Sequence, residues 1–199
     1  FRQAAYVLND RRRWPECLAF LKRAVERDPK TPRLYADLAR YALYLGENTA
    51  GLDAVKKANE LDAVNRPWRR NIEEVLRVLR KHYVELETDG MLVRVLAKDR
   101  PAFRRHYRPF IERSYDLLTR KYGLTPKGVA AAGNRVVVDM FAHPADFNAR
   151  TFGYDHPGLV GVCFGPFLAM HDGRAAAGSG MAWGRTFHHE STHVLTLEL

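Results

Sequence analysis

Two histidines and a glutamate near the end of the chain have the types and the spacing that metal chemistry needs. His189, Glu190 and His193 form the pattern His-Glu-x-x-His. Residues four apart share one face of an α-helix, so the two imidazoles can bind one metal ion. Glu190 projects about 100° further round, from where its carboxylate can take a proton from a water in an open metal position. The pattern predicts a hydrolytic metal site, with Glu190 as the general base.

The helix that this interpretation needs is also predicted by the residues around the motif. The glycine-rich run 173–184 predicts a loop just upstream, and neither proline nor glycine interrupts 185–199. The apolar side chains that would pack this helix against the rest of the protein are Phe187, Val194, Leu195 and Leu197. A structural alternative stays open, in which two hydrogen-bonded histidines and a glutamate lie on a partly buried amphipathic helix.

Three further segments match a known pattern: Gly161 to Gly165, Phe167 to Met170, and Trp183 to Thr186, which leads into the His-Glu-x-x-His motif. With that motif they resemble gluzincin-type zinc metallopeptidases of the peptidase MA-like group. The likeness is greatest to bacterial proteins that carry tetratricopeptide (TPR) repeats ahead of the protease domain. It implies Zn²⁺ bound by His189 and His193, Glu190 as the general base, and a peptide or protein substrate.

The same resemblance implies a third protein ligand, a glutamate on a later helix. Glu198 follows His193 by five residues and lies about 140° away round the same helix, which is a poor position for a ligand. We therefore expect the third ligand beyond residue 199 and the peptidase domain to be incomplete at its C-terminus. The start at Phe1, without an initiator Met, also suggests a portion of a longer protein.

The remaining candidate ligands and nucleophiles have weaker support in the sequence. His188 is turned away from the His189/His193 face, which predicts a surface or supporting role. Cys17 and Cys163 lie far apart in different predicted units and are expected to be free thiols. Cys163 is predicted to be a buried small side chain, because no histidine is placed by sequence to activate it. Third-ligand positions within the chain that stay conceivable are His156, His171 and Asp172.

The first part of the chain contains an internal repeat. Four pairs of matching residues are separated by the same number of positions: Cys17 and Gly51, Leu21 and Val55, Ala24 and Ala58, and Asp28 and Asp62. This interval of about 34 residues is the period of the TPR, a helical hairpin in which small side chains let two helices approach closely. We predict TPR-like helical repeats over 1–82, closed by a helix over 67–82, that can bind a protein partner.

The second domain is predicted over 83–199. Alternating residues on both sides of Thr88-Asp89-Gly90 predict a β-hairpin. Helical spacing returns over 101–122 and 143–151, and strands are predicted over 135–141 and 160–170. By the family resemblance, the last strand forms the upper edge of a cleft where a peptide adds as an extra strand. The expected fold class is α+β, with helical TPR-like hairpins followed by the strand-and-helix part of a zincin-like domain.

Composition narrows the classes of protein that the chain can represent. With 46% hydrophobic and 28% charged residues it is typical of a globular protein. No run approaches the roughly 20 apolar residues of a membrane span. This stretch of chain shows no signal sequence, but a fragment cannot show a missing start, so the compartment stays open. The net charge of +9 divides into +7 over 1–82 and +2 over 83–199. Its densest cluster, at residues 11–13, lies at a predicted turn without a nucleic-acid signature, so no nucleic-acid partner is expected.

Two function classes follow. The first is a zinc-dependent metallopeptidase whose TPR-like repeats bind proteins. The alternative is a non-catalytic TPR scaffold that carries a peptidase-like domain. Zinc-dependent peptide hydrolysis distinguishes these two classes. A third class, a basic nucleic-acid binder, ranks below both and would be recognised by binding that weakens steeply as salt is added.

Overall fold

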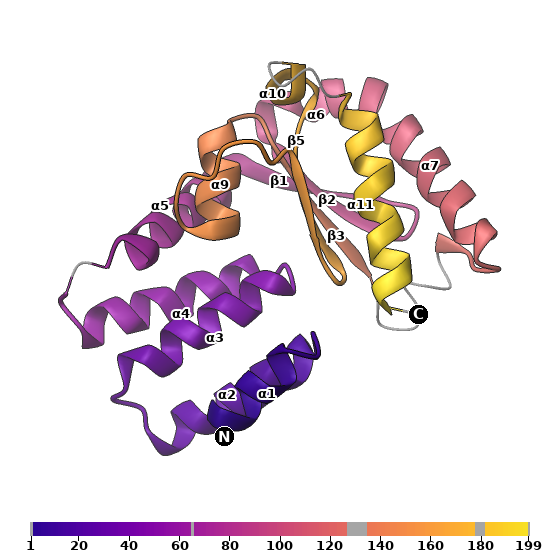
Figure 1. Cartoon of the computed structure of the whole chain (residues 1–199). Coiled ribbons are helices and arrows are strands. Elements are labelled where there is room, and N and C mark those ends of the chain that lie inside the picture. The colour runs from indigo at the N-terminus through magenta and orange to yellow at the C-terminus, as the bar shows by residue number, and fades with distance from the viewer. Residues whose placement is uncertain (1, 65, 127–134, 178–181, 199) are drawn as a thin grey trace. The chain divides into compact units, whose positions relative to one another are not determined.

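The computed structural model describes residues 2–64, 66–126, 135–177 and 182–198 (Figure 1). The chain divides into two compact units. The first contains Phe1–Arg80 and Ala149–Asp155, and the second contains Lys81–Asn148 and His156–Leu199. The first unit is made of helical hairpins and the second is built on a five-stranded mixed sheet with helices, so the chain is an α+β protein.

Five helices form most of the first unit, and prolines mark the beginning of three of them. Their bounds are α1 Arg2–Asn9, α2 Trp14–Arg27, α3 Pro32–Tyr44, α4 Asn48–Leu61 and α5 Pro67–His82. Proline is favoured in the first turn of a helix because its missing N–H has no intrahelical partner there. The predicted closing helix over 67–82 is confirmed as α5.

The repeat found in the sequence is also present in the packing of the hairpins. Helices α2 and α4 have the same length, and their first residues, Trp14 and Asn48, are one repeat interval apart. Cys17 of α2 donates its thiol hydrogen to the carbonyl oxygen of Ala5 at 3.2 Å. At the equivalent position, a Cβ on Gly51 would lie 2.8 Å from Cδ2 of Leu43 and 3.7 Å from the carbonyl oxygen of Ala39. Small residues at equivalent positions therefore bring each pair of helices together.

Residues 149–155 belong to the helical unit, although the sequence placed them in the second domain. The buried guanidinium of Arg150 donates to the carbonyl oxygen of Leu43 and to Oδ1 of Asn48, both at 2.8 Å. Asn71 Nδ2 donates to the carbonyl oxygen of Gly153 at 2.8 Å. Arg150, although distant in sequence, thus supplies hydrogen-bond donors to two acceptors at the turn between α3 and α4.

The sheet of the second unit has the strand order β1-β2-β3-β5-β4. Its strands are β1 Tyr83–Thr88, β2 Met91–Leu96, β3 Val136–Phe141, β4 Gly161–Phe164 and β5 Phe167–His171. The pairs β1/β2 and β4/β5 are antiparallel, and β2/β3 and β3/β5 are parallel. The predicted hairpin around Asp89 and Gly90 is confirmed, with Gly90 at a φ of 82°.

The prediction of one strand over 160–170 is wrong. The structure has two antiparallel strands there, with Phe164 paired with Phe167. Gly165, at a φ of 56°, adopts the left-handed conformation that a tight turn requires, and Pro166 follows it. Apolar residues lie on both sides of this turn, so the hydrophobic pattern of the sequence does not reveal it. As a result β4 returns to the outer position of the sheet.

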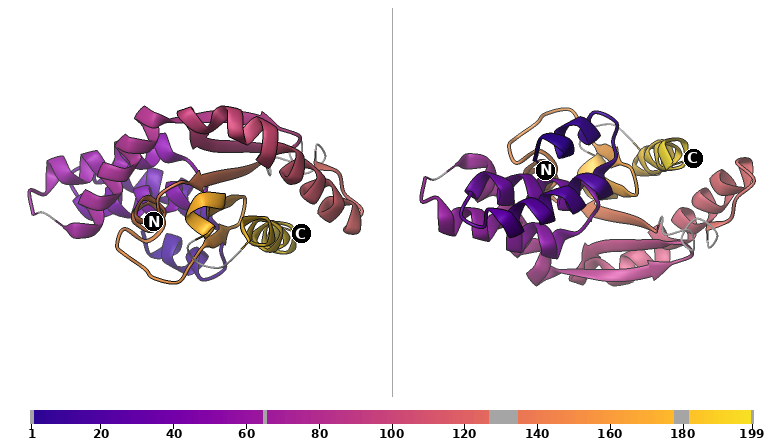
Figure 2. Two further views of the ribbon diagram at one scale, coloured as in Figure 1. Left: turned by 90° about the horizontal axis from the view of Figure 1, so that it is seen from above. Right: turned by 90° about the horizontal axis from the view of Figure 1, so that it is seen from below.

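Helices α7 and α11 cover one face of this sheet (Figures 1 and 2). The helical segments after β2 are η1 Ala97–Asp99, α6 Arg100–Ala102, π-helical η2 Phe103–Tyr107, α7 Arg108–Lys121, α9 Pro144–Phe152, α10 Gly173–Ala177 and α11 Trp183–Glu198. The helix predicted over 101–122 thus consists of α6, η2 and α7 in succession. Ile111, Tyr115 and Leu118 of α7 and Phe187, Val194 and Leu195 of α11 share one core with β2, β3 and β5. None of the described helices combines the length and apolar character needed to cross a bilayer.

Candidate functional site

The His-Glu-x-x-His motif lies on α11, which begins earlier than the sequence indicated. The helix includes Gly184, which we had assigned to the upstream loop, and its first turn is closed by Arg185 N and Thr186 N, which donate to the carbonyl oxygen of Ala182 at 2.9 and 3.3 Å. A Cβ on Gly184 would lie 2.8 Å from Cζ of Phe110. Close packing under this ring explains why a glycine stands inside the helix. Part of the predicted loop is also helical, as α10, and residues 178–181 lie outside the described part of the chain.

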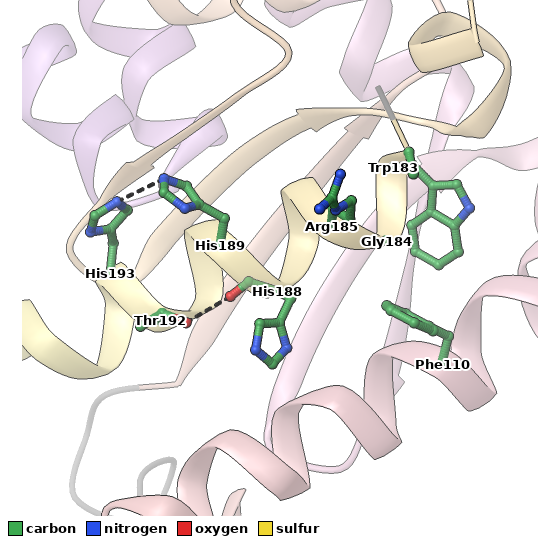
Figure 3. Close-up of a pocket in the computed structure, with 9 residues that line it drawn as sticks. Phe110, Trp183, Gly184, Arg185, His188, His189, Thr192 and His193 are labelled. Atoms are coloured by element: carbon green, nitrogen blue, oxygen red, sulfur yellow. Dashed lines mark hydrogen bonds between the residues drawn. The ribbon is translucent and has the colours of Figure 1, made fainter. Parts of the chain in front are cut away.

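His189 and His193 converge on one point beside α11. Both are exposed, and Figure 3 shows their rings on the same side of the helix. The two Nε2 atoms are 3.1 Å apart, and the ring planes are nearly perpendicular at 88°. Two nitrogens bound to one tetrahedral zinc at 2.0–2.1 Å stand about 3.3 Å apart. The separation therefore fits a hydrogen bond between the two rings as well as the binding of both to one metal ion.

Glu190 lies on the adjoining side of α11, against the outer strand β4. It keeps 9% of its surface exposed, so it is buried without being closed off from solvent. A Cβ on Gly161 would lie 3.1 Å from Cγ and 3.3 Å from Oε1 of Glu190. Burial raises the pKa of this carboxyl, and the neighbouring charges of His189 and His193 act in the opposite direction. A carboxyl with a raised pKa is better matched to proton transfer near neutral pH.

Strand β4 runs past this carboxylate as the last strand of the sheet. It pairs with β5 on one side, and no described strand pairs with its other side. Helix α11 contacts both β4 and β5. Strand β4 is therefore the edge strand of this sheet on the side of Glu190, and extended peptides bind by addition to edge strands.

A cavity of about 840 Å³ extends along the exposed side of α11 and includes both histidines (Figure 3). One wall is aromatic, because the Trp183 ring lies 4.9 Å from Phe110 and 4.7 Å from Tyr107, measured between centroids. This wall is not predicted by the sequence. Nothing in the local pattern connects Phe110 on α7 with Trp183, since the two residues meet only in the folded unit.

His188 points toward α7 rather than toward the histidine pair (Figure 3). Its Nδ1 lies 2.9 Å from Oγ of Ser114, a buried residue of α7 that the sequence did not single out. His188 also lines the cavity. A supporting role, as expected from its position next to His189, agrees with this contact.

Within the described ranges, no group of three His, Cys, Asp or Glu side chains could hold a metal ion. His171 is buried at the end of β5, with its ring 4.7 Å from that of Phe147. Asp172 accepts hydrogen bonds from the backbone of Arg174 and Ala175 and from the Arg174 guanidinium, so it caps α10. His156 lies in the loop before β4, and the side chain of Glu198 is outside the described residues.

The two cysteines are free thiols. Cys17 is fully buried, and burial raises its pKa to about 11. Cys163 of β4 is half-buried and not fully buried as predicted, and it donates to the carbonyl oxygen of Gly165 at 3.3 Å.

No protein-family model, curated protein or solved structure matches the chain. Support for a function therefore comes from the geometry of the residues around α11.

Proposed function

We propose that the chain carries part of a zinc-dependent peptidase of the gluzincin type, preceded by TPR-like repeats that bind a protein partner. The observation that supports it most directly is the 3.1 Å separation of the two Nε2 atoms of His189 and His193, with Glu190 between them in sequence. His189 and His193 would hold the metal. Bound zinc supplies a Lewis acid and lowers the pKa of a bound water.

The side chains have separate tasks in this proposal. Glu190 accepts a proton from the attacking water and passes it to the amine of the leaving peptide. Its buried position beside β4 raises the pKa of the carboxyl, which favours acceptance of the proton from water. The outer side of β4 aligns an extended substrate through main-chain hydrogen bonds. The aromatic wall made by Phe110 and Trp183 offers space for an apolar side chain of the substrate.

Zinc content and peptide hydrolysis, measured together on the full-length protein, test the proposal. Glu190→Gln should keep the zinc and lose hydrolysis by about 100-fold or more, as removal of a general base does. His189→Ala and His193→Ala should lose both zinc and hydrolysis. His82→Ala, at an exposed histidine of α5, is the matched control and should change neither. Unchanged hydrolysis in Glu190→Gln would exclude Glu190 as the base.

A TPR-type scaffold is the second candidate. The packing of Cys17 on Ala5 and of Gly51 on Ala39, at equivalent positions of the repeat, favours it. Stacked helical hairpins present surfaces that bind peptides. A scaffold would capture a protein partner while the full-length protein shows no zinc-dependent hydrolysis.

A further inference from the structure

Positive charge in the second unit is concentrated on one helical segment. Between residues 98 and 122 there are eight Lys and Arg against three Asp and Glu, a net charge of +5, whereas the whole of 83–199 has only +2. The three acids are each paired: Asp99 with Arg174, Glu112 with Arg108, and Asp116 with Arg120. The segment therefore carries cations that its own acids do not neutralise.

The cations left over are exposed on η1, α6, η2 and α7. No described residue forms an ion pair with Lys98, Arg100, Arg104, Arg105, Arg113 or Lys121, and all six are exposed. Arg104 and Arg105 lie in the π-helical turn Phe103–Tyr107. Wide turns of this kind are rare and often mark functional positions.

Large apolar side chains are exposed on the same segment. Phe110 is 40% exposed, Leu117 60% and Tyr122 36%. Spacings of three and four place Phe110, Arg113, Leu117 and Lys121 along one side of α7. The opposite side carries residues of the unit's core, Ile111, Tyr115 and Leu118. The outer side of α7 thus combines unpaired cations with apolar groups in contact with solvent.

We propose that the outer side of α7, with Phe110, Arg113, Leu117 and Lys121, binds the anionic lipid surface of a membrane. A helix that lies in the interface inserts its apolar side chains among the acyl chains and places its cations against the anionic headgroups. Leu117 separates this partner from nucleic acid, because phosphate backbones attract the cations but leave a leucine in water. An acidic protein partner would be distinguished from a membrane by its independence of Leu117 and by competition with polyglutamate. The proposal does not depend on metal binding or hydrolysis.

Co-sedimentation of the protein with lipid vesicles tests this directly. We expect binding to vesicles that mix phosphatidylcholine with phosphatidylglycerol, none to phosphatidylcholine alone, and weaker binding as salt is added. Arg113→Gln/Lys121→Gln should weaken partitioning by about 30-fold, because each basic side chain near an anionic surface contributes about a fivefold factor. Leu117→Gln should weaken it without changing the net charge.

Arg11→Gln/Arg12→Gln is the matched control, since it removes the same charge from an exposed turn of the helical unit. It should bind as the unchanged protein does. Circular dichroism and melting temperature verify that each variant is folded. The proposal is overturned if the unchanged protein does not bind anionic vesicles, or if the control loses as much binding as Arg113→Gln/Lys121→Gln. It is also overturned if Leu117→Gln has no effect while DNA or polyglutamate removes the protein from the vesicles.

Discussion

At the scale of single residues, burial decides what the ionisable groups of the second unit can do. Glu190 and His171 both lie mostly out of water, yet burial acts on them in opposite directions, because it disfavours the charged form of each. It raises the pKa of the Glu190 carboxyl and lowers that of the His171 imidazole. The first shift suits an acceptor of protons at neutral pH. The second keeps an imidazole neutral beside Phe147.

The lowered pKa of His171 predicts a dependence of stability on pH. The unfolded chain binds a proton at His171 at a higher pH than the folded chain does, so the contribution is full above about pH 6.5 and is lost as the pH falls through the folded pKa. His171→Leu should flatten the loss of unfolding free energy between about pH 7 and pH 5. Urea unfolding at several pH values measures it, and an equal slope in both proteins would contradict the prediction.

At the scale of elements, the close approach of α11 to β4 positions the candidate base. Gly161 permits it, since a Cβ there would lie 2.5 Å from Cγ2 of Thr186 as well as near Glu190. No other described strand lies beyond β4, so a change in this contact moves α11 relative to the outer strand.

Gly161→Ala should therefore destabilise the protein by about 1–3 kcal/mol, the usual cost of overpacking. It should also reduce any hydrolysis by displacing Glu190. Thr186→Ser removes the methyl group that the new Cβ would meet, so Gly161→Ala/Thr186→Ser should recover part of the stability. Denaturant midpoints of the two single variants and the double variant measure this coupling. Additive effects would show that the contact is not the cause.

At the scale of the whole molecule, sequence order and spatial units do not coincide. Residues 149–155 interrupt the second unit along the chain and belong to the helical unit. Arg150 is central to this arrangement, because its buried guanidinium serves acceptors at the turn between α3 and α4.

Arg150→Met should destabilise the helical unit by about 1–3 kcal/mol, because buried acceptors lose their donor. Amide hydrogen exchange should become faster in α3 and α4, although residue 150 is far from these helices in sequence. Arg80→Met, at an exposed arginine of α5, is the control and should leave exchange unchanged. Unaltered exchange in Arg150→Met would show that the bonds to Leu43 and Asn48 contribute nothing measurable.

The sequence by itself determined what depends on neighbours along the chain. The helix that carries His189 and His193, the β-hairpin at Asp89-Gly90 and the helix over 67–82 follow from local periodicity and turn residues, and all three are present. The spacing of four also predicted the convergence of the two imidazoles, because a helix fixes it. Zinc binding, peptidase activity and protein binding by the repeats stay predictions.

Only the tertiary structure decided which distant residues meet. It placed Gly161 against Glu190, Ser114 against His188 and Phe110 over Gly184. It also split the apolar run 160–170 into two strands, because pairing with β3 on one side and β4 on the other satisfies the backbone of β5. Such contacts join residues that have no periodic relation along the chain, so composition and spacing carry no signal for them.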